Sequence, residues 1–75
     1  MKSEAERTME EGAVKILQES QPRLLKVVKV LLNEGETPAR IEKAVKRMGT
    51  PATITDLVRM AAEALRAAQG KESEG

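Results

Sequence analysis

TPARIEKAVKRMGTPATITDLVRMAAEAL, which runs from Thr37 to Leu65, is the stretch that decides the fold. A Thr-Pro-Ala triplet opens each half of it. Threonine before proline is a frequent helix start, because the hydroxyl caps the first turn and proline lacks only an N–H that has no helical partner there. Gly49 ends the first half, since glycine readily takes the left-handed conformation that closes a helix. The stretch therefore predicts two helices joined by a tight corner at Gly49-Thr50-Pro51.

The apolar residues of both halves recur at the spacing of an amphipathic helix. The inward-facing residues are predicted to be Ile41, Ala44, Val45 and Met48 in the first half, and Ile54, Leu57, Val58, Ala61, Leu65 and Ala68 in the second. The pattern predicts helices over about residues 37–48 and 51–69, with Gly70 as the end of the last one.

Two further helices are predicted before this stretch, over about residues 4–18 and 22–33. The first has one apolar stripe and is interpreted as cover for the core or as a dimerisation arm. The second is apolar on most sides, which is typical of a buried helix, so we expect it to be the spine of the domain. The sequence thus predicts one all-α domain over residues 1–75, a small four-helix bundle whose ends at 1–3 and 70–75 are flexible.

Composition excludes several classes of function. The chain has 75 residues and no cysteine, histidine, tryptophan, tyrosine or phenylalanine. Without thiols or imidazoles it lacks the usual nucleophiles, general bases and zinc ligands, so we expect no enzyme, no metal and no cofactor. No run approaches the roughly 18–20 apolar residues that span a bilayer, and the acidic N-terminus does not resemble a signal peptide. We therefore expect a cytoplasmic protein.

Charge is distributed unevenly along the chain. The formal net charge is only +1, yet residues 23–66 contain nine Lys/Arg against five Asp/Glu, a net of +4. The segments on either side are acidic. A basic centre is compatible with binding a polyanion. The alternative is that these charges form a helix face exposed to solvent and bind nothing.

The corner contains a ten-residue spacing between a small residue and an apolar one. Ala44 lies ten residues before Ile54, and Gly49 lies between them. At these positions the chain resembles bacterial helix-turn-helix regulators, and Thr50–Val58 is similar to the start of the recognition helix in regulators of the multiple-antibiotic-resistance type. The resemblance covers about residues 34–66. It implies that the third and fourth helices form a helix-turn-helix-like pair and that the chain is a dimeric transcriptional regulator bound to double-stranded DNA.

The resemblance also implies which side chains face DNA. The expected base contacts are Ala52, Thr53, Thr55 and Arg59. The expected contacts to the phosphate backbone are Arg40, Lys43, Lys46 and Arg47. Threonine and arginine can hydrogen-bond base edges, whereas backbone contacts supply affinity that depends on salt. The alternative role of Thr53 and Thr55 is to cap the start of their helix, and it is favoured slightly for Thr53.

Two alternatives to DNA binding stay open. The spacing of Gly35, Gly49 and the apolar residues around them also resembles the three-helix ubiquitin-associated domains, which would make the chain a protein-interaction module. Those domains bind through an apolar residue after the first-loop glycine, where this chain has Glu36. A partner protein or a second subunit is expected to use Met60, Ala64 and Ala67. The other alternative is a structural or designed bundle without a ligand.

Overall fold

The computed structural model describes the backbone of residues 3–74 and the side chains of residues 3–68. It contains four helices: α1 (Glu4–Ser20), α2 (Pro22–Asn33), α3 (Pro38–Arg47) and α4 (Ala52–Glu74). No strand occurs between residues 3 and 74. The predicted all-α, four-helix architecture is confirmed.

Local hydrogen bonds explain where α1 and α3 begin and where α2 ends. Ser3 caps α1 by accepting a hydrogen bond from the backbone N–H of Glu6 (3.2 Å), and Thr37 caps α3 by accepting one from Arg40 (3.3 Å). Gly35 has a φ of +94° and closes α2, with backbone N–H groups of Gly35 and Glu36 donating to the last carbonyls of that helix. This is the Schellman arrangement, in which a glycine just past the end of a helix takes the left-handed conformation.

The two ends of α4 differ from the prediction. The helix begins at Ala52, and the first helical hydrogen bond runs from the N–H of Thr55 to the carbonyl of Pro51 (2.9 Å). Pro51 therefore occupies the position before the helix, whereas Pro38 is the first residue of α3. At its other end α4 passes Gly70 and reaches Glu74. Residues 1, 2 and 75 lie outside the described residues, so the flexibility of the two ends stays a prediction.

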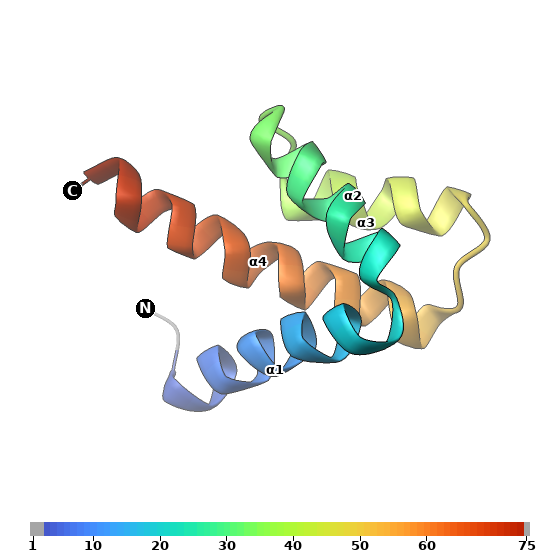
Figure 1. The fold of residues 1–75 in the computed structure, drawn as a ribbon, viewed down its shortest axis with the longest axis horizontal. Coiled ribbons are helices and arrows are strands. Elements are labelled where there is room, and N and C mark those ends of the chain that lie inside the picture. Colours follow the sequence, from blue (N-terminus) through green and yellow to red (C-terminus); the bar gives the residue numbers. More distant parts are fainter. Residues whose placement is uncertain (1–2, 75) are drawn as a thin grey trace.

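The spine of the molecule is α4, and the prediction that α2 is the spine is wrong. Helix α4 packs against all three others, most extensively against α1 and then α3 (Figure 1). Val58, Ala61 and Ala62 of α4 are fully buried. Small side chains at 61 and 62 let neighbouring helices approach closely, so one helix can be covered on several sides. Among the described side chains, the buried apolar core consists of Ala13, Leu17, Leu25, Val28, Leu32, Ile41, Val45, Val58, Ala61 and Ala62.

Helix α2 is buried on one side only. Leu25, Val28 and Leu32 face the core, at the i, i+3, i+7 spacing of one helical stripe. Val27 and Val30 face solvent, with 39% and 51% of their surface exposed. A mostly apolar sequence predicted a buried helix because it does not reveal which sides of the helix the other helices cover.

Candidate interaction surfaces

The side of α3 that faces the core differs from the helix-turn-helix expectation. Ile41 and Val45 are buried together with Pro38, but Ala44 is exposed, so the prediction that Ala44 faces α4 is wrong. At 100° per residue, Ala44 lies roughly a quarter turn away from the buried stripe. Met48, also predicted to face inward, is 67% exposed because it lies at the corner before α4 begins. The crossing of α3 and α4 is therefore set by Ile41 and Val45.

Three of the four predicted base-contacting residues are at the surface, and the fourth is not. Ala52, Thr53 and Arg59 are exposed. Thr55 is only 6% exposed, and its hydroxyl donates to the carbonyls of Pro51 (3.1 Å) and Thr50 (3.4 Å). Its side chain holds the start of α4 in place and is not available to a base edge, so the prediction for Thr55 is wrong.

Carboxylates surround the exposed start of α4. The guanidinium of Arg59 lies 3.7 Å from the carboxylate of Glu42, which α3 contributes. A small hollow beside this pair is lined by Glu42, Lys46, Thr50, Ala52, Thr55 and Asp56. Two acidic residues at the position expected to meet a DNA groove would repel phosphates. Sequence spacing did not predict this, because Glu42 lies on another helix.

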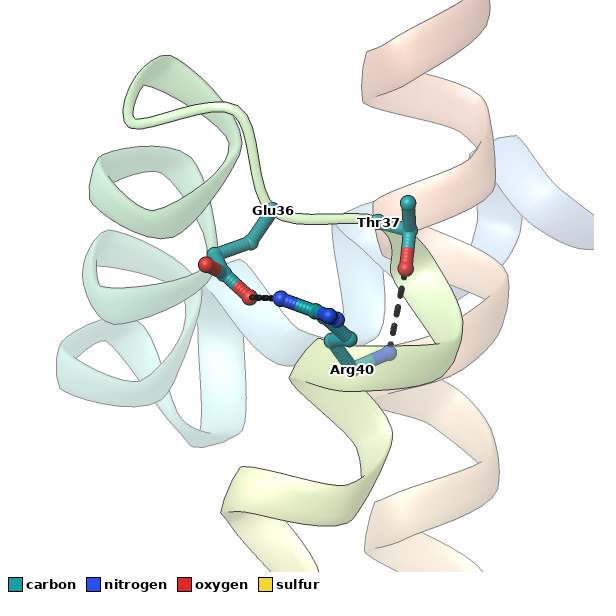
Figure 2. Close-up of polar contacts among 3 residues, drawn as sticks. All are labelled: Glu36, Thr37 and Arg40. Carbon is teal, nitrogen blue, oxygen red and sulfur yellow. Dashed lines mark hydrogen bonds and ion pairs between the residues drawn. The ribbon is translucent and has the colours of Figure 1, made fainter.

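The four predicted backbone-contacting residues are all exposed, but they do not form one stripe. Arg40, Lys43 and Arg47 share the exposed side of α3 that includes Ala44, since they lie three and four residues apart. Lys46 lies on another side, in the hollow next to the start of α4. Figure 2 shows Arg40 directed back toward the carboxylate of Glu36, with 3.9 Å between the charged atoms. The structure thus separates the cationic stripe of α3 from the exposed residues that were predicted to contact bases.

An apolar groove, which the sequence did not predict, lies between α2 and the corner that joins α3 to α4. Its hollow has a volume of about 370 Å³. Leu24 and Ile54 are half-buried in it, while Val27 and Met48 stand exposed at its sides. A second, smaller hollow of about 260 Å³ continues along α2 past Val30 and Leu31. We call this continuous surface the α2 groove; its apolar residues are Leu24, Val27, Val30, Leu31, Met48 and Ile54.

The rim of the α2 groove is basic. Arg23 lines both of its hollows and Lys26 lines the second. None of the described residues lining either hollow is acidic. The groove therefore combines exposed apolar side chains with positive charge at its edge.

The surface expected for a partner, around Met60, Ala64 and Ala67, is less open than predicted. Met60 and Ala64 are half-buried, and only Ala67 is exposed. Ala64 and Ala67 line a small hollow in which α1 contributes Arg7, Glu10 and Glu11. The small residues of α4 mainly serve contact with α1 within the chain.

Two further features are absent from the described residues. No cluster of three or more acidic residues there could hold a metal ion. Nor is any described helix both long and apolar enough to cross a membrane. No family model, curated protein or solved structure matches the chain. Two surfaces of the chain itself, the α2 groove and the cationic stripe of α3, therefore carry the information about its function.

Proposed function

We propose that this chain is a non-enzymatic protein-interaction module that binds an acidic amphipathic helix of a partner in the α2 groove. The observation that carries the proposal is the exposure of Val27 (39%), Val30 (51%) and Met48 (67%) on one continuous surface. Exposed apolar surface is unfavourable in water, and its burial against a partner contributes roughly 25 cal/mol per Å².

The shape of the α2 groove favours a helix as its occupant. A helix binds such a groove through apolar residues at i, i+3 or i+4, and i+7, which fall on one face. The α2 groove offers matching partners at several depths, from half-buried Leu24 and Ile54 to exposed Val30. Two hollows that share Val27 and follow one another along α2 suit an elongated apolar ridge better than a compact ligand.

Charge at the rim favours an acidic partner. Arg23 and Lys26 border the apolar surface, and no acidic side chain lines it. Acidic residues flanking the apolar face of a partner helix would meet these cations and raise the association rate, whereas a basic partner would be repelled. Specificity would then come from charge, and affinity chiefly from apolar burial.

The test is a titration of the isotope-labelled chain, followed by NMR, with two synthetic amphipathic helical peptides. The peptides share their apolar residues and carry either acidic or basic flanks. We expect the acidic peptide to shift the amide signals of Val27, Val30, Met48 and Ile54, and to bind at least about tenfold more tightly than its basic twin. Equal binding of both peptides, or shifts centred elsewhere, would contradict the proposal.

A matched pair of variants locates the binding site. Met48→Glu places a carboxylate in the α2 groove and is expected to weaken binding of the acidic peptide at least about tenfold, since the charge would be desolvated beside like charges. Ala39→Glu adds the same charge at an exposed position of α3 outside the groove. It should leave the affinity nearly unchanged.

Binding of double-stranded DNA is a second candidate, supported by the cationic stripe of α3. Arg40, Lys43 and Arg47 are exposed on one side of that helix and suit contacts to the phosphate backbone. Such binding would be salt-dependent, and the double variant K43E/R47E should weaken it and lower the salt slope by about 2. Fluorescence anisotropy with a labelled duplex at low salt measures this. Absence of binding at micromolar protein would count against DNA.

A further inference from the structure

The exposed large apolar side chains of the described residues fall into two groups. Val27, Val30 and Met48 belong to the α2 groove, whereas Met9 (62% exposed) and Ile16 (49% exposed) lie on α1. The second group has no role in the fold or in the proposed function. This group lies on an acidic helix, so its charge is complementary to that of the basic groove.

Met9 and Ile16 form an apolar edge along α1. They lie seven residues apart, which is close to two helical turns, so they share one side of the helix about 10 Å apart along its axis. Gly12 lies between them near the same side, and a Cβ atom built on it would meet nothing within 4 Å. The α1 edge, defined as Met9, Gly12 and Ile16, is thus a low ridge with two apolar side chains and no bulk between them.

The α1 edge and the α2 groove carry opposite charge. Helix α1 contains five glutamates against one arginine and one lysine, a net of −3. Helix α2 contains one arginine and two lysines without any acidic residue, a net of +3. Glu6, Glu19 and Lys15 lie within about a quarter turn of the edge and are exposed, so two of the three charges beside it are negative. Arg23 and Lys26 are exposed beside the groove. An α2 groove packed against another α2 groove would bring like charges together.

We propose that the acidic helix bound in the α2 groove is α1 of a second copy of this chain. The inference rests on the proposed function of the groove and names its occupant. Met9 and Ile16 of one copy would pack on Val27, Val30 and Met48 of the other, while Glu6 and Glu19 face its Arg23 and Lys26. The contact joins two different surfaces, so a pair of copies retains one free edge and one free groove until a ring or a reciprocal pair closes.

Two substitutions test this contact because each removes only one half of it. Met9→Lys places a cation on the α1 edge, and Val30→Glu places an anion in the α2 groove. The introduced lysine and glutamate are good helix formers, and both positions are exposed. Sedimentation equilibrium should show the unmodified chain associating at micromolar to millimolar concentration. We expect each variant alone to associate at least about tenfold more weakly. Circular dichroism should show that both retain their helix content.

Mixing the two variants provides the decisive measurement. The Met9→Lys chain retains an intact groove, and the Val30→Glu chain retains an intact edge. One favourable contact can therefore form between them, and we expect a one-to-one complex that neither variant forms by itself. An interface made of two identical surfaces cannot be restored in this way.

Several outcomes would overturn the inference. If the unmodified chain is monomeric at millimolar concentration yet binds the acidic peptide in the groove, the second copy is not the partner and the proposed function stands. If the chain associates but Met9→Lys has no effect, the interface lies elsewhere, for example between two α2 helices. A monomer that binds neither peptide contradicts both proposals.

Discussion

At the scale of single residues, Thr55 shows why a residue's role depends on its surroundings. Threonine near the start of a predicted recognition helix can contact a base or cap the helix, and both roles were open for Thr53 and Thr55. The structure makes them different: Thr53 is exposed, whereas Thr55 is 6% exposed and bonded to the carbonyls of Thr50 and Pro51. Burial at position 55 could not be predicted without knowing which side of α4 the other helices cover.

Thr55→Val is expected to destabilise the fold, while Thr53→Val is not. Valine keeps the shape of threonine but removes the donor to Pro51, which should lower the free energy of unfolding by about 1 kcal/mol. Thr53 is exposed, so the same change there should alter it by less than about 0.5 kcal/mol. Urea denaturation of both variants measures the difference. Equal effects would mean that the Thr55 hydroxyl contributes nothing to stability.

At the scale of helices, the glycines could be assigned roles from the sequence. Gly35 and Gly49 follow the predicted ends of two helices, and both have positive φ angles of +94° and +83°. Gly12 lies within α1, where a glycine only weakens the helix. The role of each glycine depends on residues close to it in the sequence, so the sequence was sufficient to predict these roles.

Substitution by alanine should lower the stability of the protein at Gly35 and Gly49 and raise it at Gly12. Gly35→Ala and Gly49→Ala force a Cβ into the left-handed region and should each destabilise the protein by about 1 kcal/mol. Gly12→Ala adds a Cβ that meets nothing within 4 Å in a helical position, and should stabilise it by roughly 0.5–1 kcal/mol. Thermal unfolding followed by circular dichroism reports the signs. A loss of stability in Gly12→Ala would contradict this account of α1.

The repeated Thr-Pro-Ala triplet does not have the same role in both helices. Thr37 accepts the hydrogen bond that caps α3, whereas α4 begins one residue later relative to its triplet. Thr37→Ala should therefore lower the free energy of unfolding by about 1 kcal/mol, and Thr50→Ala by a few tenths at most. Chemical denaturation of the two variants under the same conditions compares them. Equal losses would indicate that Thr50 also caps its helix.

At the scale of the whole molecule, the helix at the centre of the packing is not the one that was predicted. The sequence favoured α2 as the spine because it is apolar on most sides. In the structure α4 contacts the other three helices, and α1 makes the most extensive contact with it. Helix α2 instead combines a buried side with the exposed α2 groove. A high apolar content thus reflected two functions of one helix, packing on one side and, in our proposal, binding on the other.

Removal of α1 is expected to abolish the fold. A chain beginning at residue 21 would expose the side of α4 that α1 covers and would lose Ala13 and Leu17 from a core of ten buried apolar residues. A domain of this size has little stability to spare. We expect loss of the cooperative thermal transition and a marked fall in helix signal. A cooperative transition near that of the full chain would show that α1 is an arm rather than part of the core.

The sequence by itself determined the number of helices, most of their bounds and the chemistry of their ends. Caps, glycine conformations and helical periodicity all arise from interactions within a few residues along the chain. Only the tertiary structure decided which helix is central, that Ala44 and Met48 face solvent, that Thr55 is buried and that Glu42 lies beside Arg59. It also brought α2 and the corner after α3 together to form the α2 groove. These features depend on contacts between residues distant in sequence, and periodicity cannot specify which apolar surface remains without a neighbour.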